Sequence, residues 1–131
     1  MAGTPANIAQ DFSDLAGHIG DILASATVKR TVKQTTELND CSIKLTTYSN
    51  QLADAGAWNA LHAAQNDFDK IKTATAGANA AAAKLKQQAN TINKILQIVG
   101  DAVALGAAIA AGPLTGVLTA ATTLASDSGA V

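Results

Sequence analysis

The sequence predicts an all-α fold, and three features of the 131-residue chain lead to that prediction. Apolar residues recur at alternating steps of three and four over most of the chain, which is the spacing of one helix face. Only two prolines occur, Pro5 and Pro113, so more than a hundred residues run without a strong helix breaker. No segment alternates polar and apolar residues for long enough to indicate a strand.

The first helix is predicted over about residues 5–54. Thr4 and Pro5 form a strong start, because threonine caps free N–H groups and proline at the first position lacks a donor that would be unpaired anyway. The apolar stripe that follows contains Ile8, Phe12, Leu15, Ile19, Ile22 and Ala26, and it returns at Leu38, Cys41, Leu45, Tyr48 and Leu52. A turn is expected at about 55–57, where Gly56 suits the left-handed conformation beyond a helix end.

The second helix is predicted over about residues 57–111 and shows the most regular pattern in the chain. Its apolar stripe runs from Leu61 to Val103 and ends with Leu96, Val99 and Val103. It keeps alternating steps of three and four across six heptads, which is typical of a coiled coil or a long bundle helix. The residues expected to form the helix–helix seam are Leu61, Phe68, Ile71, Ala78, Ala82, Leu85 and Ile92.

Two architectures fit these elements, within a single helical domain over residues 1–131. In the first, two helices of about 75 Å each form a long, coiled-coil-like antiparallel hairpin, with a short third helix at about 114–126. In the second, the helices break near Ala26 and Gly77 and give a compact four-helix bundle. The long hairpin is the architecture that we expect, and the compact bundle is the alternative.

The composition argues against several classes of function. A net charge of −1 gives no reason to expect a nucleic-acid partner. Cys41 is the only cysteine, which excludes an intrachain disulfide and a CxxC metal motif, and His18 and His62 are the only histidines. The chain contains neither a phosphate-binding glycine loop nor a GxSxG motif. We therefore expect no enzymatic activity, no cofactor and no metal site.

The N-terminal residues MAGTPANIAQDFSD lack the basic and continuous apolar regions of a secretory signal peptide. Synthesis in the cytosol is the expectation, and export by a non-cleaved route or association with a membrane stays open.

The C-terminal part of the chain changes character, because the 25 residues from Ala102 to Ser126 carry no charge. Such a stretch is long enough to span a bilayer as one kinked helix, which needs about 20 residues. Divided at Gly112-Pro113, each half is too short to span alone and suits a shallow hairpin. The residues predicted to form this membrane or assembly segment are Ile95, Leu96, Ile98, Val99, Val103, Leu105, Ile109, Leu114, Val117, Leu118 and Leu124.

The segment NKILQIVGDAVALGAAIAAGPLTGVL, in which a long amphipathic helix runs into a Gly/Ala-rich apolar stretch, resembles a region of two protein classes. It is similar to the stalk-to-head transition of long-helix α-pore-forming toxins and to the hydrophobic translocators of bacterial secretion systems. The resemblance covers about residues 57–126 and implies a soluble form that hides the apolar segment and an assembled form that inserts it.

The sequence thus predicts a non-enzymatic, self-assembling helical protein with a membrane-interacting C-terminal segment. Its expected partners are further copies of the chain or another helical protein, and a lipid bilayer. The alternative is a soluble structural or interaction module, such as a filament subunit or a secreted helical-hairpin dimer, whose apolar tail packs within the bundle.

Overall fold

The computed structural model describes residues 4–54, 58 and 63–131, and the predicted all-α class is confirmed there. The described residues form five helices and no strand. These helices are α1 (Pro5–Ala24), α2 (Val32–Leu52), α4 (Gln65–Leu85), α5 (Ile92–Ala111) and α6 (Leu114–Gly129). The turn predicted at 55–57, with Gly56, and the seam residue Leu61 lie outside the described residues.

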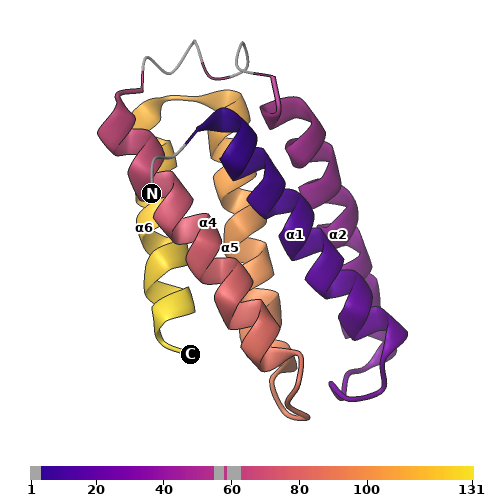
Figure 1. The fold of residues 1–131 in the computed structure, drawn as a ribbon. Coiled ribbons are helices and arrows are strands. Elements are labelled where there is room, and N and C mark those ends of the chain that lie inside the picture. The colour runs from indigo at the N-terminus through magenta and orange to yellow at the C-terminus, as the bar shows by residue number, and fades with distance from the viewer. Residues whose placement is uncertain (1–3, 55–57, 59–62) are drawn as a thin grey trace.

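The elongated hairpin that we expected is wrong, and the chain adopts the alternative architecture, a compact bundle. The helix expected over 5–54 is divided by a first turn at 25–31, and the helix expected over 57–111 by a second turn at 86–91. Helices α1 and α5 each contact both α2 and α4, so these four helices form a ring, and α6 contacts α4 and α5. Figure 1 shows α1 and α2 together on one side of the bundle and α6 on the other.

The first turn is held by Arg30, whose guanidinium group donates to the carbonyl oxygens of Leu23 and Ser25, both at 3.2 Å. These carbonyls belong to the end of α1, where backbone acceptors have no partner within the helix. Helix α2 then begins with a capping box, in which the Thr31 hydroxyl accepts from the Gln34 amide and the Gln34 side chain accepts from the Thr31 amide. Together these bonds stabilise a break between two helices.

The second turn is held by the buried Thr91 hydroxyl, which donates to the carbonyl oxygens of Leu85 at 2.9 Å and Gln88 at 3.1 Å. The backbone amide of Lys29 donates to the carbonyl oxygen of Ala89 at 3.0 Å. The two turns therefore lie together at the same end of the bundle.

The breakpoint predicted near Ala26 is confirmed, and the one predicted near Gly77 is wrong. Gly77 lies inside α4, and the second turn begins nine residues later. A Cβ atom at Gly77 would make only an ordinary contact of 3.8 Å with the Cβ of Ser128. The helix continues through this glycine because its neighbours are mostly alanines, which have the highest helix propensity.

The start and the buried face predicted for α1 are confirmed. The Thr4 hydroxyl accepts from the Asn7 amide at 3.1 Å, and Pro5 is the first helical residue. The predicted stripe residues within α1 are all buried: Ile8, Phe12, Leu15, Ile19 and Ile22. Ala26 was predicted to continue this face, but it lies exposed in the first turn.

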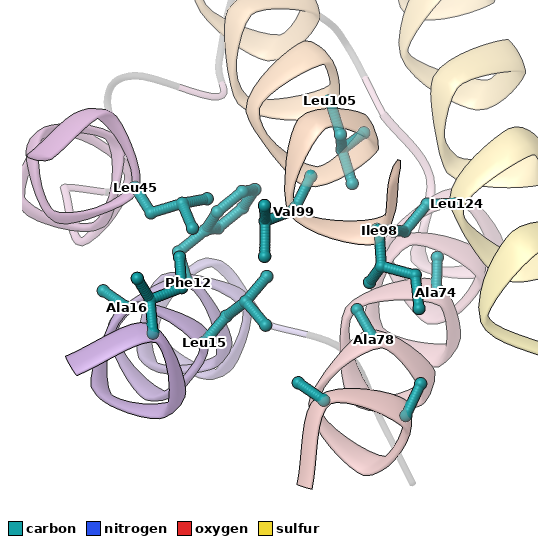
Figure 2. Close-up of a cluster of buried hydrophobic side chains, with 14 of the residues drawn as sticks. Phe12, Leu15, Ala16, Leu45, Ala74, Ala78, Ile98, Val99, Leu105 and Leu124 are labelled. Atoms are coloured by element: carbon teal, nitrogen blue, oxygen red, sulfur yellow. The ribbon is translucent and has the colours of Figure 1, made fainter. Parts of the chain in front are cut away.

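The core is built from side chains of all five helices. Figure 2 shows Phe12 of α1, Leu45 of α2 and Val99 of α5 pointing toward one another. On α4 the core positions include Ala74 and Ala78, both fully buried. Because alanine is short, α4 can lie close to α1 and α6 on either side, as the contacts between these helices show.

Trp58 connects the end of α2 with the start of α4. Its indole N–H donates to the carbonyl oxygen of Leu52 at 2.9 Å, and its ring lies 5.5 Å from the ring of Phe68. The side chain is buried, so this contact closes the end of the bundle opposite the two turns.

Candidate membrane-facing hairpin

Helices α5 and α6 form a hairpin because α5 stops at Gly112. This residue has φ 61° and ψ −179°, a backbone conformation that is almost restricted to glycine, and its amide donates to the carbonyl oxygen of Ala108 at 2.8 Å. Pro113 precedes α6, and its carbonyl oxygen accepts from the amides of Gly116 and Val117. The chain therefore reverses at the break that the sequence indicated.

The large apolar side chains of this hairpin face inward. None of the residues predicted for the membrane or assembly segment is fully exposed. The buried ones are Ile95, Ile98, Val99, Leu105, Ile109, Val117 and Leu124, and the half-buried ones are Leu96, Val103, Leu114 and Leu118. In this structure they pack within the hairpin and against α2 and α4.

The buried face of α5 differs from the one that the heptad stripe predicted. The stripe continued through Leu96, Val99 and Val103, but only Val99 is buried. The other core residues of α5 lie off the stripe: Ile95, Ile98, Ala102, Leu105, Gly106 and Ile109. The second turn lets α5 rotate about its axis independently of α4, so the register of one helix does not fix the face of the next.

The outer face of the hairpin carries no charge from Ala102 to Ser126, and we call residues 102–126 the uncharged hairpin. Its exposed residues are Ala104, Ala107, Ala110, Ala111, Pro113, Thr115, Gly116, Thr119, Thr122, Thr123, Ala125 and Ser126. The exposed faces of α1 and α2, by contrast, include Asp14, Asp21, Lys33, Glu37, Asp40 and Lys44. The surface is thus divided into a charged part and a part without charge.

Hydroxyl groups on the hairpin are partly satisfied by the helix itself. The hydroxyls of Thr119, Thr122 and Thr123 donate to carbonyl oxygens four residues earlier, at 2.9 to 3.1 Å. Threonines on α2, such as Thr46 and Thr47, make the same bond. The feature that distinguishes the hairpin is therefore its lack of charge.

Among the described residues, α5 is the one helix that is long and apolar enough to cross a membrane, judged by length and composition alone. The core helix of a bundle meets the same criterion, and the inner face of α5 is such a core face. Length and composition therefore agree with either environment.

Two carboxyl groups mark the charged limits of the uncharged hairpin. Asp101 lies on α5, just before the uncharged hairpin, and Asp127 lies on α6, just after it. Burial, and then the neighbouring carboxyl group of Asp127, raise the pKa of Asp101 to about 7. The Oδ2 atom of Asp101 is buried without a hydrogen-bond partner.

The predicted seam is largely buried but joins different helices from those expected. Ile71, Ala78, Ala82 and Leu85 are buried, and Phe68 and Ile92 are half-buried. All but one of these residues lie on α4, which contacts α1 and α6 as well as α5. The seam is therefore part of a bundle core and not the interface of two long helices.

The sequence did not indicate the polar contact between α1 and α4. Asp11 is buried, and its carboxylate accepts from Lys72 Nζ and Thr75 Oγ1, both at 2.7 Å. Its backbone carbonyl accepts from Asn79 at 3.0 Å. One signal in the sequence indicated that Asp11 is buried. It lies three residues after Ile8 and four before Leu15, which is the spacing of the buried stripe.

Of the remaining polar candidates, His18 and Cys41 lie within the described residues. His18 Nδ1 lies 3.1 Å from Lys86 Nζ, and burial together with that ammonium group lowers the pKa of His18. Cys41 is half-buried, and burial raises the pKa of its thiol. In the part of the chain that the structure describes, no three His, Cys, Asp or Glu side chains are placed to hold a metal ion, and His62 lies outside that part.

Comparisons with protein-family models, with curated proteins and with solved structures gave no match. We therefore infer the function from the residues of this chain.

Proposed function

We propose that this is a non-enzymatic, self-assembling helical protein that presents its uncharged hairpin to a lipid bilayer. The observation that carries the proposal is the exposed face of residues 102–126, which contains no charged group. A helix face in contact with water normally carries charged and polar side chains. A face built mainly of alanine and threonine forfeits little hydration when it leaves water for the membrane interface.

The inner face of the hairpin supports a mechanism of exchange. Ile98, Leu105 and Ile109 are now buried within the bundle. Burial of the same side chains in lipid, or between copies of the chain, would contribute about the same free energy, roughly 25 cal/mol per Å² on either side. Because the two terms nearly cancel, a small bias can shift the population from one state to the other.

The hairpin geometry favours shallow insertion followed by assembly. The uncharged legs, residues 102–111 and 114–126, are shorter than the roughly 20 residues that cross a bilayer. Small residues such as Ala107 and Ala110 on the outer face would let a second helix approach closely in the membrane. This is the behaviour implied by the resemblance to long-helix pore-forming toxins and hydrophobic translocators, with further copies of the chain as partners.

The test is flotation of the purified full-length chain with neutral and anionic liposomes at about pH 6, with release of an enclosed dye read from the same mixture. Ala107→Asp places a charge on the outer face of the hairpin and should abolish both flotation and release. Ala76→Asp is the matched control, because Ala76 is also exposed in the middle of a helix, α4, outside the hairpin. Leu105→Asp and Ile109→Asp are unsuitable, since both residues are buried and the variants would unfold the bundle.

Flotation that is lost in Ala107→Asp and kept in Ala76→Asp supports the proposal. A folded full-length chain that does not float, or that floats equally well with Ala107→Asp, contradicts it. The alternative function, a soluble structural or interaction module, is favoured by the inward orientation of the large apolar side chains. If the flotation test fails, the soluble module becomes the conclusion, and the outer face of the hairpin would be tested for contacts with other proteins.

A further inference from the structure

The ends of four helices come together at the two turns, at the lower end of the bundle in Figure 1. Gln34 in the first turn of α2 donates to the side chain of Asn93 in the first turn of α5 at 3.5 Å. Lys86, directly after α4, has its ammonium group 2.9 Å from the carboxylate of Asp21 near the end of α1. The ends of α1 and α4 and the starts of α2 and α5 therefore form one surface.

We call this surface, residues 21–35 and 82–95, the basic end. It carries six basic side chains and one acidic one, a formal charge of +5, whereas the rest of the chain carries three basic and nine acidic ones, a formal charge of −6. The basic side chains are Lys29, Arg30, Lys33, Lys84, Lys86 and Lys94, and the acidic one is Asp21. The small net charge of the chain thus hides a large separation of charge.

Little of this positive charge is compensated within the molecule. Asp21 is paired with Lys86, and within the described residues no other side chain of the basic end forms an ion pair. The guanidinium group of Arg30 donates to neutral groups, three carbonyl oxygens and one hydroxyl. Glu37, one turn beyond Lys33 on α2, is exposed and forms no ion pair with it. Five positive charges therefore remain without an acidic partner.

Two of these lysines lie where the helix itself disfavours a cation. Lys33 and Lys94 are exposed in the first turns of α2 and α5, at the positive end of each helix dipole. An acidic residue would stabilise the helix there, and Lys94 follows Thr91 at the spacing of a capping box, which favours glutamate. Helix stability therefore does not account for these lysines, and a negatively charged partner outside the chain does.

An exposed apolar side chain within the basic end indicates the kind of partner. Val32 is 85% exposed and borders a surface hollow together with Lys29 and Arg30. At an anionic bilayer, apolar groups enter the interface while neighbouring cations meet the lipid phosphates. A single-stranded nucleic acid would instead stack its bases on aromatic side chains. The four aromatic residues of the chain all lie outside the basic end: Phe12, Tyr48, Trp58 and Phe68.

On the basis of the function proposed above, we propose that the basic end binds the headgroups of anionic phospholipids and holds the uncharged hairpin against the bilayer.

Two exposed lysines of the basic end border the hairpin. Lys94 lies on α5, about 12 Å along the helix before the hairpin begins at Ala102. Lys84 lies at the rim of a surface hollow that includes Ser128 and Gly129, at the end of α6. Because lysine side chains are long and flexible, their ammonium groups can reach lipid phosphates while the hairpin lies in the interface.

The experiment is flotation of the full-length chain with two kinds of vesicle, phosphatidylcholine alone and phosphatidylcholine with about 30% phosphatidylserine. Binding to the anionic vesicles should be stronger, by about fivefold for each lysine or arginine that reaches the surface. This preference should disappear in 1 M salt, because the Debye length falls from about 10 Å at 0.1 M to about 3 Å.

Lys94→Glu tests the site, and Lys44→Glu is the matched control. Lys44 is an exposed lysine on α2 outside the basic end, and the two variants change the net charge equally. Because Lys94→Glu reverses a charge, it should weaken binding to the anionic vesicles about 25-fold and leave binding to the neutral vesicles unchanged. Lys44→Glu should keep the preference of the wild type. Circular dichroism establishes that both variants are folded, and the glutamate of Lys94→Glu favours its helix start.

Equal binding of the wild type to neutral and anionic vesicles, or an equal loss in Lys94→Glu and Lys44→Glu, overturns the role of the basic end and leaves the proposed function standing. Binding to a DNA duplex that is tighter than binding to the anionic vesicles, and that is lost in Lys94→Glu, overturns the assignment to lipid. Absence of binding to both kinds of vesicle overturns the proposed function and the role of the basic end with it.

Discussion

The contact between Gly106 of α5 and Tyr48 of α2 makes a sharp prediction about stability. A Cβ atom at Gly106 would lie 2.6 Å from Cδ2 and 2.8 Å from Cγ of the tyrosine ring. Carbon atoms in ordinary contact are about 3.5 to 4.0 Å apart, so Gly106→Ala requires a movement of about 1 Å by the ring or by the helix. Tyr48 is half-buried, and its ring can move only by breaking its packing against the core.

Two opposing terms set the size of the effect. Alanine favours a helix over glycine by about 1 kcal/mol, and overpacking of a core contact costs about 1–3 kcal/mol. Gly100→Ala measures the gain in helix propensity without overpacking. Gly100 lies on the same helix, is exposed, and has no atom within 4 Å of the position that a methyl group would occupy. We expect Gly100→Ala to stabilise the protein by up to about 1 kcal/mol. Gly106→Ala should be about 1–3 kcal/mol less stable than Gly100→Ala.

Urea unfolding followed by circular dichroism measures the free energy of unfolding of the two variants. A thermal scan should show a Tm for Gly106→Ala that is several degrees below that of Gly100→Ala. The substitution Tyr48→Ala in both backgrounds should remove most of the difference between them. If Gly106→Ala instead stabilises the protein as much as Gly100→Ala does, α2 and α5 do not pack as described.

Two further variants test the polar contact and the hairpin turn. Asp11→Ala should lower the free energy of unfolding by about 3 kcal/mol, because Lys72 keeps a largely buried charge without its partner. Lys72→Met should cost less, since Thr75 still donates to Asp11, and equal losses in urea unfolding would contradict this asymmetry. Gly112→Ala should destabilise the protein by about 1–3 kcal/mol, because its positive φ strains any side chain. Gly116→Ala, at a helical position with open space, is its control and should be neutral or stabilising.

Features that depend on neighbouring residues could be predicted from the sequence. The helix start at Thr4-Pro5 and the reversal at Gly112-Pro113 are set by backbone conformations and by hydrogen bonds over a few residues. The inner face of α1 follows from apolar residues three and four apart. The capping box Thr31–Gln34 was also present in the sequence and could have located the first turn.

The second turn could not be located in this way. The apolar stripe passes from Leu85 to Ile92 with its steps of three and four unbroken, although the helix ends between them. What stabilises the turn is a buried hydroxyl at Thr91 and a backbone bond from Lys29 to Ala89, which joins segments about sixty residues apart. A partner so distant in the chain leaves no periodic signal.

By itself, the sequence determined that the chain is helical, which segments are apolar, and that the tail from Ala102 to Ser126 is without charge. The tertiary structure decided which face of α5 is buried and that Asp11 meets Lys72. The physical reason is the range of the interactions. Helix propensity and periodicity act over about four residues, whereas the choice of a buried face depends on which helices arrive from elsewhere in the chain.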